Sequence, residues 1–325
     1  MGEDLRPCQR FSSFESGAMA DVITVGAGVV GLTAAIRLRE AGVAADVVAR
    51  EPPERTTSAV AAALWYPYRA FPRERVEGWS TRGFAVLSDL AGVPGSGVRM
   101  RWGLERIAPD SGDPWWRPAV PTFSRTADGF RFAAPVADMS VHLRWLVRRL
   151  AVLGGTVETG ALASLDHALE RARVVVNCAG LGARELAGDR EMLAVRGQVV
   201  RVEQLGIEEW FLDQSNPRDL VYVVPRERDV VLGGTAQDGD EELRADPATA
   251  AAIRARCEAA VPALRGARVV GEAVGLRPAR PAVRLEAEAR AGGTVVHCYG
   301  HGGEGVTLAW GCAEEVVRLA TAALG

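Results

Sequence analysis

Between residues 21 and 50, apolar runs alternate with glycine-rich turns. Residues 22–25 are all apolar or β-branched, which is typical of a strand buried on both faces. An apolar helical stretch begins near Leu32 and stops at Gly42, and residues 45–49 form a second strand-like run. A strand, a helix and a second strand in this order predict a βαβ unit in a parallel sheet.

The later part of the chain mixes helical and strand-like periods. Apolar positions recur at helical spacing in residues 139–153, 248–261 and 306–323. Short apolar or alternating runs predict strands at residues 174–177, 198–202, 221–224, 230–232 and 295–297. Residues 70–135 are rich in Pro, Trp and Arg and contain only short strand-like runs.

This order predicts an α/β (α+β) fold in which an antiparallel sheet domain is inserted into a Rossmann-like domain. The nucleotide-binding domain would be discontinuous and consist of residues 21–70, 140–190 and 270–325. The substrate-binding domain would consist of residues 71–139 and 191–269. Residues 1–20 lack periodicity, and we expect either a disordered leader or the product of a start upstream of Met19.

Composition excludes several functional classes. The chain has 325 residues, 48% of them hydrophobic, and a net charge of −3, so neither nucleic acid nor an anionic membrane is an expected partner. No apolar run reaches the roughly 20 residues of a membrane span. The cysteines form no CxxC pair and the histidines are far apart, so we expect no metal site. The odd number of cysteines and the lack of an apparent secretory leader predict a cytoplasmic location.

The first glycine-rich turn has the pattern of a dinucleotide-binding loop. Gly26 permits the tight turn, Gly28 lets the backbone approach a pyrophosphate, and Gly31 lets the helix pack on the strand. The free N–H groups at the start of the following helix attract phosphate. The residues between these glycines would face the same ligand; they are Ala27, Val29 and Val30.

The second strand ends in Ala49, Arg50 and Glu51. An acid at this place usually holds the ribose hydroxyls, and Glu51 could take that role. Arg50 could instead select a phosphorylated ribose, so NADP remains an alternative at this point.

Two more segments bear on the cofactor and the substrate. In residues 275–281 (GLRPARP), two prolines predict a rigid turn that holds Arg277 in position to grip a carboxylate with two bonds. Residues 295–305 form a strand that enters a very glycine-rich turn before a helix, which would aim a second helix N-terminus at a ligand.

Together these segments resemble the D-amino-acid oxidase family, which includes D-aspartate oxidase. The resemblance covers residues 21–325 and is most specific in VVHCYGHGGEG with the later GCA, in GLRPARPAVRLE, and in LVYVVPRERDVVLGG. It implies an FAD-dependent oxidation of D-amino acids by hydride transfer, with molecular oxygen as the acceptor and a 2-oxo acid, ammonia and hydrogen peroxide as products. It implies no catalytic acid or base, and a possible homodimer.

The resemblance also implies residue roles. Tyr222 and Arg277 would hold the substrate carboxylate, and the carbonyl of Gly303 would accept from the substrate amine. FAD would contact residues in four segments: the first turn (Gly26, Ala27, Gly28, Val29, Val30, Gly31), the segment after the second strand (Arg50, Glu51, Thr56, Thr57, Ser58, Ala62, Ala63, Leu64), Leu162, and the second turn (Gly302, Gly303, Glu304, Gly305, Val306, Thr307).

This chain departs from the family pattern at several positions. Cys298 replaces an Asn of many relatives, and Tyr66 replaces a Gln of the vertebrate ones. Arg218 stands where relatives with an active-site lid have a second Tyr, so the lid could be reduced. Arg218 could reach over the pocket and favour acidic D-amino acids, or it could be a solvated turn residue.

Three other functions remain open on the sequence. A glycine- or sarcosine-type amine oxidase would share the fold and Arg277. A flavin dehydrogenase would pass electrons to an acceptor other than oxygen. A non-catalytic nucleotide-binding module would leave Tyr222 and Arg277 apart in space. We interpret His297 and His301, which flank the second turn, as packing or hydrogen-bonding residues.

Overall fold

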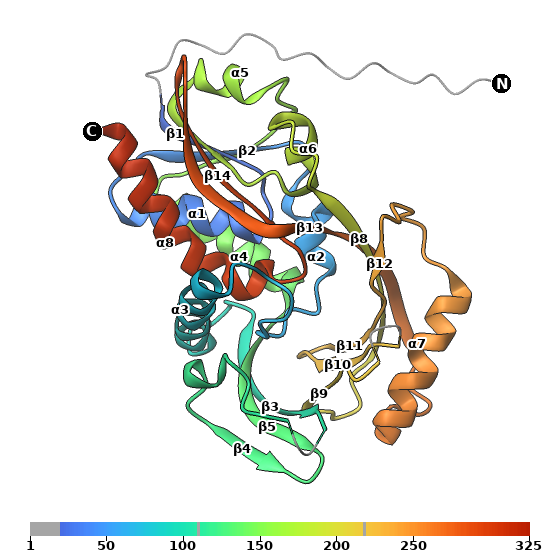
Figure 1. Cartoon of the computed structure of the whole chain (residues 1–325). Helices are drawn as coiled ribbons and strands as arrows, with labels where there is room; N and C mark the ends of the chain where they lie inside the picture. Colours follow the sequence, from blue (N-terminus) through green and yellow to red (C-terminus); the bar gives the residue numbers. More distant parts are fainter. Residues whose placement is uncertain (1–19, 109–110, 217–218) are drawn as a thin grey trace, which may run out of the picture.

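The computed structural model describes residues 20–108, 111–216 and 219–325. Its strands form one mixed sheet (Figure 1). The strands at one end all pair in parallel; in spatial order they are β14 (Gly293–His301), β7 (Ala172–Asn177), β1 (Ala20–Val25), β2 (Ala45–Ala49) and β6 (Val157–Thr159).

The sheet continues beyond β14 with antiparallel pairs, apart from one parallel pair between β9 and β3. In spatial order these strands are β13 (Val269–Arg290), β8 (Leu193–Glu203), β11 (Asp229–Gly233), β10 (Val221–Pro225), β9 (Trp210–Asp213), β3 (Val98–Arg106), β5 (Gly129–Ala137) and β4 (Phe123–Thr126). The short strand β12 (Gln237–Asp238) also pairs with β8. The predicted combination of a parallel and an antiparallel sheet is therefore present.

The parallel strands are apolar throughout because helices cover both of their faces. On one face, α1 and α8 pack on Val22, Val174 and Val296, whereas the alternate residues of these strands pack with α5. The helices of the structure are α1 (Val29–Glu40), α2 (Thr57–Val60), α3 (Arg73–Ala91), α4 (Met139–Val152), α5 (Leu165–Leu169), α6 (Ala183–Leu186), α7 (Pro247–Ala260) and α8 (Gly305–Leu324). Short 3₁₀ helices span Pro53–Arg55, Arg117–Ala119, Gly180–Gly182 and Pro262–Leu264.

The antiparallel strands have two different faces. Val200, Phe211 and Val223 form one apolar cluster with Ile253 of α7, which covers the outer face (Figure 1). Their neighbours along the strands, such as Leu212, point the opposite way and join the central core. This inner face looks towards the parallel half of the sheet, and it carries the candidate site.

Helix α3 was not expected from the sequence, which indicated only short strand-like runs there. Charged residues interrupt the apolar pattern of α3, whose buried face includes Trp79, Gly83 and Phe84. Gly83 lies so close to the carbonyl of Thr307 that a methyl group would not fit, and Gly311 lies equally close to the backbone of Trp79. Helix α3 is thus tightly packed on α8 and fixes the position of its first turns.

Residues 275–281 do not form the rigid turn that the two prolines predicted. They belong to β13, where Arg277 pairs with Val195 and Pro278 with Ala194 of β8. The fixed φ of proline is compatible with extended backbone, which explains the error. The ladder between β13 and β14 is irregular between Ala279 and Arg284.

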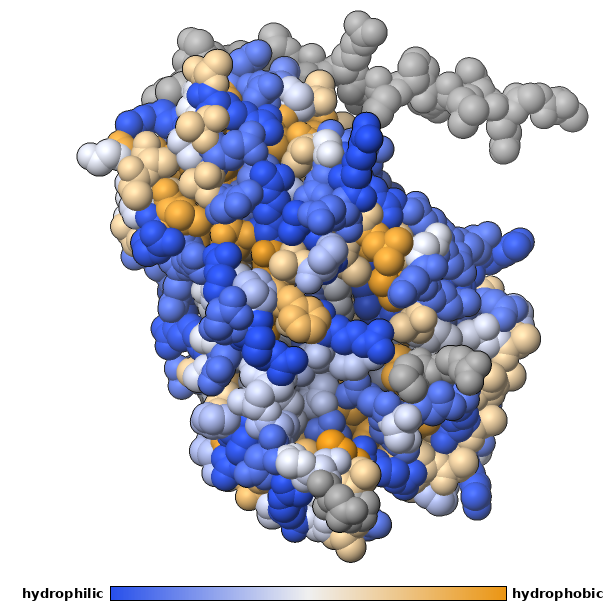
Figure 2. Space-filling model, in the orientation of Figure 1, coloured by the Kyte–Doolittle hydropathy of each residue, from blue (hydrophilic) through white to orange (hydrophobic). Residues whose placement is uncertain are grey.

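In the view of Figure 2, hydrophilic residues cover most of the surface and hydrophobic residues appear in small separate groups. None of the helices in the described part of the chain is long and apolar enough to cross a membrane.

One buried histidine gives the fold a testable pH dependence. His142 is fully buried, and its Nδ1 donates to the carbonyl of Ser96 at 2.8 Å. Burial lowers its pKa to about 4. The folded protein therefore binds fewer protons than the unfolded chain between about pH 6.5 and pH 4. Its contribution to stability is present above this window and is lost as the pH falls through it.

We expect that His142→Asn reduces the fall in unfolding free energy over this window by up to about 1.4 kcal/mol per pH unit. Urea titrations at several pH values measure this. His167→Asn is the control, since the His167 side chain is 47% exposed. Equal pH slopes for wild type and His142→Asn would contradict the assignment.

Candidate cofactor and substrate site

The two glycine-rich turns, which come from opposite ends of the chain, meet in the structure. A methyl group placed on Gly305, at the start of α8, would lie 3.7 Å from Val29 Cγ1 and 3.8 Å from Val30 Cγ2, at the start of α1. Neither helix has a side-chain cap or an acidic residue in its first turn. Two helix N-termini therefore converge on one region, and their positive dipole ends favour an anionic ligand.

Glycines are needed in the first turn for steric reasons. Gly26 has a φ of +111°, and a side chain there would meet the carbonyl of Cys178. A methyl group on Gly31 would overlap the carbonyl oxygen of Gly26. The half-buried Gly28 and Val30 and the buried Ala27 and Val29 complete this turn. The geometry agrees with the mechanical roles predicted for a dinucleotide-binding loop.

The segment after β2 connects the first turn to β13. The backbone N–H of Val29 donates to Ser58 Oγ at 3.0 Å, and Thr57 Oγ1 donates to the carbonyl of Leu276 at 3.0 Å. Ala63 has a φ of +60°, which non-glycine residues rarely adopt and which often marks a functional site. The other predicted residues here are half-buried; they are Thr56, Ala62 and Leu64.

The residues predicted for the adenosine end lie together at the far edge of the parallel strands. Arg50 and Glu51 are exposed, and Glu51 lies 3.8 Å from Arg55 in an ion pair. Leu162 follows β6, which pairs with β2. Its side chain packs on the cluster that contains Val48.

Tyr222 and Arg277 lie on the same inner face of the antiparallel strands. Tyr222 is in register with Gly233 of β11, and its ring lies over Gly233 and Gly234. The Arg277 guanidinium lies over Gly197 of β8. A side chain at any of these glycines would collide with the tyrosine or the arginine. Because these three glycines have no side chains, Tyr222 and Arg277 can both pack directly on the backbone of the sheet and contact each other.

The Arg277 guanidinium is free to bind an anion. Its Nη1 donates to the carbonyl of Thr235 at 2.9 Å, and the Tyr222 hydroxyl lies within its hydrogen-bonding reach. Burial raises the pKa of Tyr222, and the neighbouring Arg277 opposes this change. Arg277 makes no ion pair with any acidic residue that the structure describes. A methyl group on Gly303 would lie 3.4 Å from Arg277 Cδ, so the second turn adjoins the guanidinium.

Glu304 is buried within the second turn, beside half-buried Gly302 and Gly305 and buried Val306. Its Oε1 accepts from the backbone N–H of Arg69 at 3.3 Å, and its Oε2 has no partner. Burial raises the pKa of Glu304 to about 8, and the positive charge of Arg277 acts in the opposite direction. Burial thus disfavours the charged form of this carboxyl, which belongs to the N-cap residue of α8.

Sequence reasoning missed Glu105, which lies on the same inner face. It is 5% exposed, and the Tyr66 hydroxyl donates to its Oε1. The Thr307 hydroxyl bonds both the N–H and the carbonyl of Tyr66 at 3.3 Å, which joins this pair to the second turn. Burial raises the pKa of Glu105 to about 7, and the bond from Tyr66 opposes this. A lone Glu in a short Arg-rich strand gave no signal of its burial.

The two histidines near the second turn were interpreted as packing or hydrogen-bonding residues, and both are buried. His297 Nε2 lies 3.0 Å from Glu288 Oε2, and its Nδ1 lies 3.3 Å from Asn177. His301 is buried beside Cys298 and Cys312, and the possible ligand atoms of these three residues lie within 4.8 Å of one another. The expectation of no metal site considered only CxxC pairs and the spacing between histidines, and it overlooked this grouping of Cys298, His301 and Cys312.

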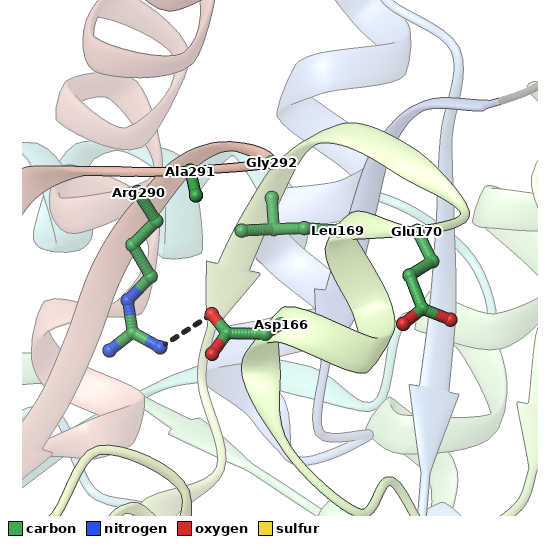
Figure 3. Close-up of a pocket in the computed structure, with 6 residues that line it drawn as sticks. All are labelled: Asp166, Leu169, Glu170, Arg290, Ala291 and Gly292. Atoms are coloured by element: carbon green, nitrogen blue, oxygen red, sulfur yellow. Dashed lines mark hydrogen bonds and ion pairs between the residues drawn. The ribbon is translucent and has the colours of Figure 1, made fainter.

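A separate hollow of about 470 Å³ lies where α5 meets the β13–β14 hairpin (Figure 3). Two of its lining residues already neutralise each other in an ion pair, because Arg290 Nη1 lies 3.0 Å from Asp166 Oδ1. It holds none of the predicted site residues. Arg218, the predicted selector of acidic substrates, lies outside the described residues.

The family model described as FAD dependent oxidoreductase matches residues 21–319, and the chain belongs to this family. Among curated relatives, the D-amino-acid oxidase of Rubrobacter xylanophilus is 55% identical over 94% of this chain and 97% of its own length. The D-amino-acid oxidase of Streptomyces coelicolor is 46% identical over 93% of this chain and 97% of its own. The crystal structure of glycine oxidase from Geobacillus kaustophilus superposes with a TM-score of 0.74 at 17% identity, covering 93% of this chain and 94% of that one, and it shares the fold.

The residues present fit FAD. A pyrophosphate needs a close backbone and a helix N-terminus that points to it, and the start of α1 provides both behind Gly26 and Gly28. The helix start at Gly305, which adjoins Val29 and has no acidic residue in its first turn, suits the flavin end. The exposed Arg50 and Glu51 would lie at the adenosine end.

We expect that Gly31→Ala gives a protein that retains little flavin on purification and melts at a lower temperature, because the added methyl overlaps the Gly26 carbonyl. The ratio of flavin to protein absorbance and a thermal melt measure this. Gly78→Ala is the matched control, since a methyl group at Gly78 meets nothing within 4 Å. Full flavin content in Gly31→Ala would contradict the role of the first turn.

Proposed function

We propose that this protein is an FAD-dependent oxidase of D-amino acids. The observation that carries the proposal is the guanidinium of Arg277, which has no ion pair with any described acid and lies with Tyr222 over Gly197, Gly233 and Gly234, beside the second turn. The relatives named D-amino-acid oxidase, at 55% and 46% identity over nearly the whole chain, support it.

The residues would hold the substrate at three points. Arg277 would bind the carboxylate with two parallel charge-assisted bonds, and the Tyr222 hydroxyl would donate a third. The carbonyl of Gly303 would accept from the amine, which fixes the α-carbon. Bound FAD would supply the acceptor for the hydride of that α-carbon. The residues of the chain would therefore serve to align the α-carbon of the substrate with the flavin, and no side chain would need to act as acid or base.

Several finer points are proposals on the family resemblance and the composition. Molecular oxygen would be the acceptor, and the products would be hydrogen peroxide, a 2-oxo acid and ammonia. Residues 21–70, 140–190 and 270–325 would form the FAD-binding domain, and 71–139 and 191–269 the substrate-binding domain. We also propose a homodimer and a cytoplasmic location.

Oxygen uptake and peroxide formation with paired D- and L-amino acids test the proposal. We expect turnover of D-amino acids only. Turnover of glycine or sarcosine but not of larger D-amino acids would replace the proposal with an amine oxidase. Turnover that occurs with an artificial electron-accepting dye under anaerobic conditions, but not with oxygen, would indicate a dehydrogenase. A preference for D-aspartate that Arg218→Ala abolishes would support the role predicted for Arg218.

We expect that Arg277→Ala retains its flavin spectrum but loses at least about 100-fold in kcat/KM, since each charge-assisted bond contributes roughly 1.5–3 kcal/mol. Tyr222→Phe should lose less, about tenfold, because it removes one hydrogen bond to the carboxylate of roughly 1.5 kcal/mol and leaves Arg277 in place. Steady-state kinetics with one neutral D-amino acid measure both effects.

Arg254→Ala is the control for these variants, because Arg254 pairs with Glu258 on α7, which covers the outer face of the sheet. Normal kinetics in Arg277→Ala would place the carboxylate elsewhere.

A further inference from the structure

Three side chains that can bind a metal ion lie together where β14 meets α8. They are Cys298 and His301 of β14 and Cys312 of α8, here called the cysteine–histidine cluster. Their possible ligand atoms all lie within 4.8 Å of one another. All three residues are buried, and both cysteines are free thiols. Two sulfurs and an imidazole nitrogen belong to the ligand set of Cys/His zinc sites.

The backbone brings these residues together. Along a regular strand, Cys298 and His301 would point to opposite faces. Gly300 lies between them with a φ of +85°, which interrupts this alternation. Cys312 comes from α8, whose position is fixed because Gly311 lies against the backbone of Trp79. The cluster is therefore held by closely packed elements rather than by a loop.

His301 has a nitrogen that no other group uses. Its Nε2 is buried and has no hydrogen-bond partner among the described residues, and the whole residue is 4% exposed. A buried polar nitrogen without a partner costs free energy. A metal ion bound at this nitrogen would provide the partner.

A fourth sulfur adjoins the cluster. Cys178 follows β7, the parallel neighbour of β14, and packs in the same core as Cys298 and Cys312. Its thiol lies within hydrogen-bonding reach of Cys298. Because structural zinc is almost always four-coordinate, Cys178 is the candidate for the fourth ligand.

The burial of the site distinguishes between the two metal ions that thiolates prefer, Zn²⁺ and Cu⁺. For the same number of thiolates, bound Zn²⁺ leaves one negative charge less than bound Cu⁺. An uncompensated charge is costly in a buried site, so the cluster favours zinc.

We propose that the cysteine–histidine cluster binds one structural zinc ion, with Cys178 as the fourth ligand. Binding releases the protons of the coordinating thiols to solvent, because the thiolate is the form that binds zinc. The ion would join β7, β14 and α8. Cys178 also lies against Gly26, so the ion would stabilise the supports of both glycine turns. This inference does not depend on the proposed function, and it replaces the expectation of no metal site.

Cys298→Ser tests the site, because it removes one sulfur and keeps a side chain of similar shape. The FAD-loaded protein is freed of metal with a chelator, equilibrated with Zn²⁺, desalted and analysed for zinc. We expect about one zinc ion per chain in wild type and nearly none in Cys298→Ser. Added Zn²⁺ should also raise the melting temperature of wild type but not that of the variant.

Cys257→Ser is the matched control, since Cys257 is a buried free thiol in the separate core under α7. It should bind as much zinc as wild type. A second test needs no variant to fold, because Co²⁺ bound by thiolates absorbs at longer wavelengths than oxidised flavin. Metal-free wild type should develop this absorption with Co²⁺ and lose it when Zn²⁺ is added.

Equal zinc content in wild type and Cys298→Ser would overturn the inference, because the zinc would then be bound elsewhere. The lack of a cobalt–thiolate absorption in wild type would overturn it as well. Neither result bears on the oxidation of D-amino acids, which the kinetic variants of Arg277 and Tyr222 test separately.

Discussion

The contact between the starts of α1 and α8 is the constraint on which the site depends. Gly305 lies against Val29 and Val30, so two helix N-termini from opposite ends of the chain face one region. Helix α3 fixes α8 through the close approach of Gly83 to Thr307, and Ser58 ties the first N–H of α1 to α2. Backbone groups of both helix starts can therefore contact an anionic cofactor from two sides.

The charges on the inner face complement one another across the site. Arg277 is a cation without an ion pair among the described residues, and the pKa values of Glu105 and Glu304 are raised by burial to about 7 and about 8. A carboxylate at Arg277 would satisfy that guanidinium. The low dielectric of this buried face would strengthen the attraction between Arg277 and that carboxylate.

Local sequence predicted the parallel half of the fold well, because strands such as β2 (Ala45–Ala49) are uniformly apolar and bounded by glycine turns. Helix α3 was missed because its many Arg and Glu residues obscure the helical spacing of its buried residues. Some of these residues, such as Gly83, are buried only because α3 packs on α8. Arg277 and Tyr222 were predicted from family motifs, and the turn expected around Arg277 was wrong because proline also suits a strand. Glu105 could not be predicted, since its burial follows from the register of β3, β9 and β10.

The central claim is that one flavin lies between the two glycine turns with Arg277 above it. A crystal structure of the FAD-bound protein with a D-amino acid, kept without oxygen, tests this most directly. The account predicts a pyrophosphate at Gly28, a flavin ring beside Gly303 to Thr307, and the substrate carboxylate on Arg277 and Tyr222. A flavin remote from either turn, or a carboxylate bound by other residues, would contradict it.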